Sequence, residues 1–347
     1  MTQQDHTVYR RRTRRSARTG APALADTLSA KIIGQPNAMT AIAPYIHLFQ
    51  SGLAPEGRPL GNFLLLGPTG TGKTRTVEVL AETLHGSPRN ILRVDCGEFQ
   101  MDHEVAKLIG APPGYLGHRE TQPLLSQAKI NSVASERCAI SIVLFDEVEK
   151  AAPSLTRLLL GILDKAILRL GDNNVVNFER CLIFLTSNLG AQSMMKELGP
   201  AFGFGDNRQA SKQQQAGRLE SLAMSAARRH FSPEFVNRLD AAITYQPLSE
   251  ESLKRILDLE LENLQRHILH RLGERAFTLH VPCKAKAFIL REGTSSQYGA
   301  REIKRTIHRH LTQPLAALVS EGAIAPRGRV VASYVEEESK IVLKPAA

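Results

Sequence analysis

The sequence contains no tryptophan and only four cysteines in 347 residues. Cys96, Cys138, Cys181 and Cys283 lie far apart and form no C-x-x-C pair, which argues against a zinc site and a disulfide framework. We therefore expect the four thiols to be reduced and mostly buried. No apolar run approaches the roughly 20 residues of a membrane-spanning helix, and none follows the N-terminus as a secretory signal requires. These absences favour a soluble, cytoplasmic protein without membrane insertion.

Acidic residues are also in the minority, since 44 Lys and Arg stand against 34 Asp and Glu for a net charge of +10. Half of this excess lies in residues 1–20, where six arginines between positions 10 and 18 are opposed only by Asp5. Such an arm is expected to be disordered and could bind nucleic acid, an anionic surface or an acidic partner. A solvated tail without a partner fits equally well, and an organelle transit peptide is a third interpretation.

The apolar content of 42% is enough to build a core, and the length suits one large or two linked domains. Between residues 21 and 248 short apolar runs alternate with amphipathic stretches, which is typical of a mostly parallel sheet flanked by helices. The expected strands are 62–66, 90–95, 140–146, 181–186 and 242–245. From 249 to 347 apolar residues recur at helical spacing, and a β-hairpin is expected at 330–343. The fold class is therefore α/β, followed by a smaller, mainly helical domain.

A phosphate-binding pattern, G-x-x-x-x-G-K-[ST], follows the first expected strand. It reads Gly67-Pro68-Thr69-Gly70-Thr71-Gly72-Lys73-Thr74. Glycines after a strand let backbone N–H groups surround phosphate oxygens, and the next helix adds positive potential at its N-terminus. Lys73 would reach the β- and γ-phosphates, and the Thr74 hydroxyl would bind Mg²⁺. The expected ligand of residues 68–74 is a nucleoside triphosphate.

The expected strand at 140–146 ends in two adjacent carboxylates, Asp146 and Glu147. Open α/β sheets bind ligands at the carboxyl ends of their strands. Asp146 is predicted to hold Mg²⁺ through its water shell, and Glu147 to polarise an attacking water molecule. The pair could also cap the next helix, because acidic residues favour a helical first turn. Both interpretations can hold together.

Further motifs resemble those of Clp-type AAA+ ATPases, and specifically the second ATPase module of ClpB, ClpA or ClpC standing alone. The resemblance covers nearly everything after residue 24. Ile33-Gly34-Gln35 resembles the entry to the adenine pocket, which implies that Ile32 and Ile33 flank the base of ATP. Thr186-Ser187-Asn188 matches the first sensor, where Asn188 would orient the attacking water. Gly299-Ala300-Arg301 matches the second, which implies that Arg301 contacts the γ-phosphate in its own subunit.

The segment from Phe231 to Asp240 resembles the one that carries the arginine finger of this family. Arg238 is the residue that would act on a neighbour's nucleotide. Catalysis then requires assembly, and a head-to-tail interface whose rotation closes produces a ring. The resemblance implies a homo-hexamer. In isolation, an arginine such as Arg238 or Arg301 is more often part of a surface ion pair.

The segment from Gly110 to Gly117 resembles the one that leads into the central pore loop of the family, where Tyr115 and Leu116 would grip substrate. The resemblance implies an ATP-driven unfoldase that threads unfolded or tagged proteins through a pore. A half-buried ring in a simple turn is the alternative for Tyr115. The chain departs from the family pattern at His118-Arg119-Glu120, where relatives are acidic, and at the secondary pore segment 168–174.

Two partner predictions remain open. Phe202-Gly203-Phe204 lies where relatives that dock on a peptidase ring carry an apolar-Gly-Phe loop, although a core contact is at least as consistent with it. The alternative function is a nucleic-acid-associated AAA+ switch or loader that uses the arginines at 10–18. A salt-sensitive affinity for nucleic acid would distinguish it from a threading motor, which unfolded protein should stimulate.

Overall fold

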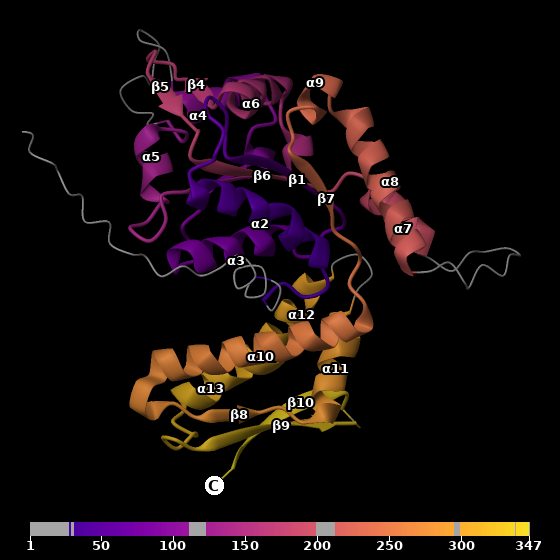
Figure 1. Ribbon diagram of the computed structural model, residues 1–347. Helices are drawn as coiled ribbons and strands as arrows, with labels where there is room; N and C mark the ends of the chain where they lie inside the picture. The colour runs from indigo at the N-terminus through magenta and orange to yellow at the C-terminus, as the bar shows by residue number, and fades with distance from the viewer. Residues whose placement is uncertain are drawn as a thin grey trace, which may run out of the picture.

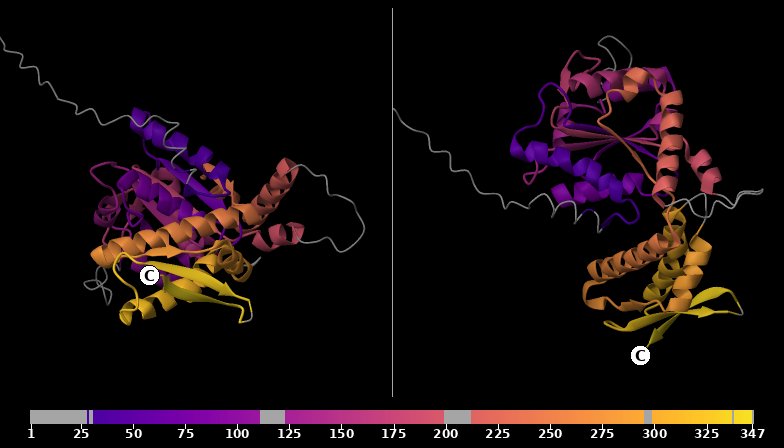
Figure 2. Two further views of the ribbon diagram at one scale, coloured as in Figure 1. Left: turned by 90° about the horizontal axis from the view of Figure 1, so that it is seen from below. Right: turned by 45° about the vertical axis from the view of Figure 1, so that its right-hand side comes forward.

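The computed structural model describes residues 28, 31–110, 123–198, 212–294, 299–336 and 338–346. A larger α/β part is followed by a smaller part with four helices and a three-stranded sheet (Figure 1). In the right-hand view of Figure 2, as in Figure 1, the smaller part lies below the larger one. Figure 1 places it next to the layer of helices α2 (Pro36–Ser51) and α3 (Lys73–His85). No helix among these residues is long and apolar enough to cross a membrane.

The larger part is built on a five-stranded parallel sheet with the order β2-β3-β6-β1-β7. Its strands are β1 (Gly61–Leu66), β2 (Leu92–Asp95), β3 (Ser141–Asp146), β6 (Cys181–Ser187) and β7 (Ala241–Thr244). Every residue of β1, β3 and β6 is buried. These three strands read as continuous apolar runs because helices cover both of their faces. The predicted strands and the α/β class are confirmed.

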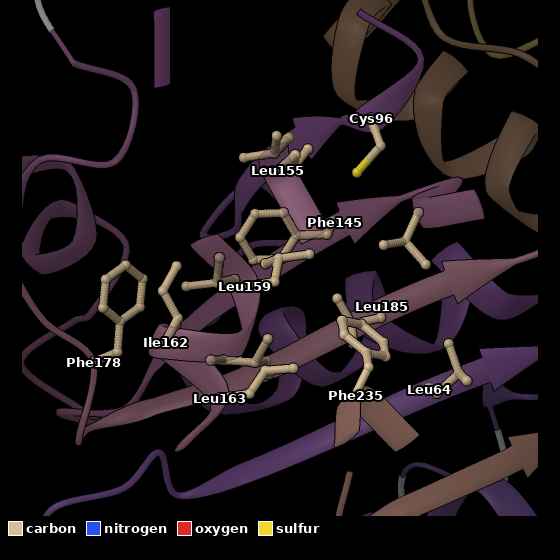
Figure 3. Close-up of a cluster of buried hydrophobic side chains, with 14 of the residues drawn as sticks. Leu64, Cys96, Phe145, Leu155, Leu159, Ile162, Leu163, Phe178, Leu185 and Phe235 are labelled. Carbon is tan, nitrogen blue, oxygen red and sulfur yellow. The ribbon is translucent and has the colours of Figure 1, made fainter. Parts of the chain in front are cut away.

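Helices α2 (Pro36–Ser51) and α3 (Lys73–His85) cover one face of the sheet. The other face packs against α6 (Pro153–Lys165), α8 (Lys212–His230) and α9 (Pro233–Val236). Figure 3 shows this second core, where apolar side chains of α6 meet Phe145 and Leu185 of the sheet. Shorter elements complete this part: α4 (Ala106–Ile109), α5 (Gln127–Ser132), α7 (Ala191–Leu198) and the antiparallel pair β4 (Ile167–Arg169) and β5 (Val175–Asn177).

The smaller part contains α10 (Glu250–Leu272), α11 (Cys283–Gly293), α12 (Ala300–Ile307) and α13 (Gln313–Ser320), with a π-helical turn at His308–Thr312. The predicted hairpin is present, because β9 (Arg329–Val335) pairs antiparallel with β10 (Lys340–Ala346). A strand that the sequence did not reveal, β8 (Thr278–His280), pairs parallel with β9. It is only three residues long, too short for a periodic signal. All four cysteines are free, and Cys96 and Cys181 are buried while Cys283 is exposed.

Candidate nucleotide-binding and catalytic site

A cavity of about 320 Å³ lies where the two parts of the chain meet. Its walls come from the loop between β1 and α3, from the carboxyl ends of β3 and β6, and from α10 and α12 of the smaller part. The sequence-predicted residues that line it are Ile32, Ile33, Thr69, Gly70, Thr71, Gly72, Lys73, Thr74, Asp146, Glu147, Asn188 and Arg301. Segments from five regions of the chain therefore share one binding space.

The loop between β1 and α3 has a backbone that only glycine can adopt. Gly67 has φ +140°, and a Cβ there would lie 2.4 Å from the carbonyl oxygen of Tyr245. Gly72 precedes the first residue of α3 with φ +107°, and no side chain caps the helix at this point. The first turn of α3, whose residues Lys73 and Thr74 line the cavity, therefore has no side-chain acceptor for its N–H groups at the N-cap. This cradle fits phosphate oxygens, which helix N-termini bind readily.

Lys73 is held in the cradle by neutral acceptors and is only 8% exposed. Its Nζ donates to the carbonyl oxygens of Gly67 at 2.6 Å and Pro68 at 2.9 Å, and to Oδ1 of Asn188 at 2.9 Å. Burial lowers the pKa of Lys73 from 10.5 to about 8, because desolvation disfavours the charged form. An anionic ligand bound next to this ammonium group would favour its charged form and raise the pKa of Lys73 back toward its ordinary value.

This pKa predicts that ATP affinity falls as the pH rises above about 8. Below pH 8 Lys73 is already charged, whereas above it the free protein must take up a proton before phosphate can pair with the ammonium group. The dissociation constant is expected to rise by up to about tenfold per pH unit between pH 8 and 9.5. Equilibrium binding of a fluorescent ATP analogue measures it. Lys73→Arg, which stays charged, should show no such rise. If the dissociation constant rises equally with pH in both proteins, titration of Lys73 is not the cause.

Asp146 and Glu147 stand at the end of β3, as the sequence predicted, and Thr186 at the end of β6 holds both. The Thr186 hydroxyl donates to Oδ1 of Asp146 and accepts the backbone N–H of Glu147 at 3.0 Å. Glu147 has φ 57°, a left-handed conformation that is uncommon for a residue with a side chain. Lys150 forms an ion pair with its carboxylate. The Thr186 hydroxyl thus fixes the carboxylate of Asp146 and the backbone of Glu147, while Lys150 pairs with the Glu147 carboxylate.

Asn188 connects the phosphate-binding loop to Glu147. Its Oδ1 accepts from Lys73, and also from the Thr69 hydroxyl at 3.4 Å. Its Nδ2 lies 3.5 Å from Oε1 of Glu147, and its backbone N–H donates to Glu149 at 3.0 Å. The amide therefore faces the lysine with its oxygen and the glutamate with its nitrogen, and so links the phosphate-binding loop to the Glu147 carboxylate.

The smaller part reaches the cavity through the start of α12. The backbone N–H of Ala300 donates to the carbonyl oxygen of Gly70 at 3.2 Å. Gly299 has φ 52°, and a Cβ there would lie 2.9 Å from the same oxygen. This close approach places Arg301 on the cavity wall. The lining also includes five apolar residues, Ile32, Ile33, Leu248, Ile256 and Leu259.

Sequence reasoning missed the contacts of Gln35. Its buried amide donates to the carbonyl oxygens of Thr71 at 3.2 Å and Gln246 at 2.8 Å, and accepts the N–H of Gln246 at 3.1 Å. It therefore ties the phosphate-binding loop to the link between β7 and α10. No local signal could reveal this, because Gln35 and Gln246 are 211 positions apart. Arg93 was missed as well, although a cation inside the apolar run of β2 was a visible anomaly.

Arg238 is not among the residues that line the cavity. It follows α9, where its guanidinium forms ion pairs with Asp164 and Glu234, both at 2.7 Å. The side chain also lies 3.4 Å from the carbonyl oxygen of Leu160. The structure therefore does not bring Arg238 to the nucleotide site of its own chain. Its action on a neighbouring subunit stays a prediction.

Several predicted sites fall outside the described residues. These are the arginines at 10–18, Tyr115 and Leu116 of the expected pore loop, and Phe202-Gly203-Phe204. Residues 168–174, the segment expected to be the secondary pore segment, are described, and they form the end of β4 and its connection to β5. Gly171 in that connection donates its N–H to the carbonyl oxygen of Ile109 at 2.8 Å, just before the expected pore loop begins.

A parallel sheet with a phosphate-binding loop, paired carboxylates and a helical lid over one cavity defines a P-loop nucleoside triphosphatase with two parts. Residues 58–242 match the family model described as AAA domain (Cdc48 subfamily). Residues 248–332 match the C-terminal, D2-small domain of ClpB protein. The chain belongs to the AAA family. The second match confirms the Clp-type resemblance.

Curated relatives extend the match over most of the chain. The chaperone protein ClpB of Meiothermus ruber is 36% identical over 302 residues, which cover 87% of this chain and 33% of the relative. The ATP-dependent Clp protease ATP-binding subunit ClpC of Staphylococcus epidermidis is 36% identical over 299 residues, which cover 86% of this chain and 35% of the relative. A solved complex of Hsp104 with casein from S. cerevisiae has a TM-score of 0.79 at 28% identity, covering 96% of this chain and 53% of that one. The chain spans about a third of the length of these curated relatives.

Proposed function

We propose that this chain is a Mg²⁺-dependent ATPase that assembles into a homo-hexameric ring and unfolds or remodels proteins. One observation carries the ATPase part: Lys73, Glu147 and Arg301 line the same cavity although they come from three distant segments. Phosphoryl transfer depends mainly on positioning and on cations placed against the transferred group. The cavity can supply both the positioning and the cations, which are Lys73 and Arg301.

Each residue has a role that follows from its contacts. The glycine cradle would bind phosphate oxygens through backbone N–H groups, while Lys73 and Arg301 would offset the charge on the terminal phosphates. Glu147 would polarise the attacking water, and Asn188 would hold the carboxylate through its Nδ2. Ile32 and Ile33 would pack against the base.

Thr74 and Asp146 both line the cavity, and a hydroxyl and a carboxylate are oxygen donors of the kind that Mg²⁺ prefers. These residues fit the metal. When bound, Mg²⁺ would neutralise part of the negative charge on the phosphates. The chain itself contributes the orientation of Asp146, whose Oδ1 accepts a hydrogen bond from the Thr186 hydroxyl.

Protein remodelling is inferred from the relatives. Two of them are named as a chaperone and as a Clp protease subunit, and a third is a complex with casein. By extension, unfolded or tagged proteins would be the substrates of this chain. Peptidase docking, nucleic-acid binding by the arginine arm and a cytoplasmic location stay predictions.

The primary test is the steady-state ATPase rate against protein concentration, measured alone, with casein and with DNA. A cooperative rise with concentration supports assembly-dependent catalysis. Stimulation by casein supports the remodelling function, whereas stimulation by DNA alone would favour the nucleic-acid alternative. A rate per chain that is independent of concentration down to nanomolar protein, without response to casein, would contradict the proposal.

The pore prediction has its own test in Tyr115→Ala. ATP hydrolysis is expected to stay within about threefold of the unmodified protein, because Tyr115 would contact substrate rather than nucleotide. Unfolding of a tagged fluorescent protein should be lost, since the aromatic ring would supply sequence-tolerant contact area. Tyr115→Phe keeps the ring and should retain unfolding. If the alanine variant still unfolds substrate at the full rate, threading through this loop is excluded.

A further inference from the structure

The strand β2 places a cation against the carboxylate that is proposed to hold the metal. Arg93 lies on β2, which pairs in parallel with β3 so that Arg93 stands opposite Leu144 and Asp95 opposite Asp146. The Arg93 side chain is about 50% exposed on the cavity wall and forms an ion pair with Oδ2 of Asp146. The Asp146 side chain is far less exposed, at 11%. The guanidinium therefore covers one oxygen, Oδ2, of this carboxylate.

Both oxygens of Asp146 are engaged by the protein itself. Thr186 donates to Oδ1, and Arg93 occupies Oδ2. Ion pairs between guanidinium and carboxylate are charge-assisted and stronger than neutral hydrogen bonds. The negative charge that would attract a divalent cation is thus already compensated by Arg93.

The neighbouring cations add to this effect. Lys73 and Arg301 line the same cavity, and the Nζ of Lys73 is directed to Gly67, Pro68 and Asn188 rather than to Asp146. A divalent cation that entered alone would have to displace Arg93, in a cavity lined by six Lys and Arg side chains against four Asp and Glu. A bound triphosphate would offset the repulsion of the metal by these cations, because its oxygens would attract both Arg93 and the metal.

We propose that Arg93 competes with divalent metal for Asp146, so that metal binds strongly only together with nucleotide. Arg93 is a positioning residue in this scheme, because it acts through Asp146. The inference rests on the proposed function, which assigns Asp146 to the metal. Its test requires no hydrolysis, so a failure of the test and a failure of the ATPase proposal can be distinguished.

The experiment is a Mn²⁺ titration of the full nucleotide-free chain, with free Mn²⁺ measured by electron paramagnetic resonance. Arg93→Met keeps the apolar stem of the side chain and removes its charge. We expect it to bind Mn²⁺ at least about fivefold more tightly than the unmodified protein, the factor that corresponds to an ion pair worth about 1 kcal/mol. With ATP present the difference should shrink, because Arg93 then has phosphate partners.

Arg75→Met is the matched control. Arg75 lines the same cavity but pairs with Glu78 at 3.3 Å, so its removal changes the cavity charge without freeing Asp146. A similar gain in both variants would show a general charge effect and would overturn the competition. The gain must also vanish when Arg93→Met is combined with Asp146→Asn, because the contested carboxylate is then absent. If the double variant still binds Mn²⁺ more tightly than the unmodified protein, the ion binds at a site other than Asp146 and the proposal is overturned.

Thermal melting shows whether Arg93→Met folds. If it does not, Arg93→Lys provides the test, because a shorter, compact cation without the planar fork pairs less well with Asp146. An intermediate gain in Mn²⁺ affinity is then expected. If the Arg93 variant folds and its Mn²⁺ affinity equals that of the unmodified protein, Arg93 does not compete with metal for Asp146.

Discussion

Replacing Glu147 with glutamine is expected to slow ATP hydrolysis by at least about a hundredfold, the range that a positioned general base contributes. The amide keeps the size of the side chain but cannot polarise water as a carboxylate does. ATP should bind nearly as tightly as before, because the glycine cradle and Lys73 are untouched. Single-turnover hydrolysis measures the first effect, and equilibrium binding of a fluorescent ATP analogue measures the second.

Glu78→Gln is the control for this substitution. Glu78 also lines the cavity, but it pairs with Arg75 rather than with Asn188. The same change of charge and shape should therefore leave the hydrolysis rate within about threefold. If Glu147→Gln hydrolyses ATP as fast as Glu78→Gln, the general-base assignment is wrong.

Arg238→Ala is expected to lower hydrolysis by about a thousandfold in the assembled protein, the lower end of the range known for arginine fingers. The decisive measurement is a mixture with Glu147→Gln. Each variant alone should be nearly inactive. In a mixed ring, a subunit with an intact Glu147 can receive the intact Arg238 of its neighbour, so part of the activity should return. A mixture as inactive as its components would place Arg238 outside the catalytic interface.

The alanine substitution also removes two ion pairs, which calls for a control of the fold. Glu234→Gln removes one of these pairs and keeps the guanidinium. Glu234 is largely exposed, and such pairs contribute at most about 1 kcal/mol to stability. This variant should therefore hydrolyse ATP nearly normally. A loss as large as that of Arg238→Ala would indicate that the pair holds α9 in place instead.

The phosphate-binding loop could be predicted because its determinants are local. Strand, glycines, lysine and helix follow one another within a few residues, and each constraint acts on neighbouring backbone. The paired carboxylates at the end of β3 could be predicted for the same reason. Thr186 is part of the motif Thr186-Ser187-Asn188, which the sequence shows. Its hydrogen bonds to Asp146 and Glu147 could not be predicted, because they depend on the pairing of β3 with β6.

Arg93 shows the limit of such reasoning. It lies 53 positions from Asp146, and the two meet only because β2 is the neighbour of β3 in the sheet. A periodic pattern shows that a segment is a strand but says nothing about the strand beside it. The bonds of Gln35 to Thr71 and Gln246 depend in the same way on contacts between distant segments.

The sequence by itself determined the five strands of the larger sheet and the chemistry of each local motif, because backbone conformation at glycine and apolar periodicity are properties of adjacent residues. Only the tertiary structure decided the strand order β2-β3-β6-β1-β7 and the contact of Ala300 with Gly70 that brings Arg301 to the cavity. It also placed Arg93 against Asp146, and Arg238 away from the nucleotide site of its own chain. These placements follow from packing between segments far apart in the chain, where many arrangements satisfy the same local pattern.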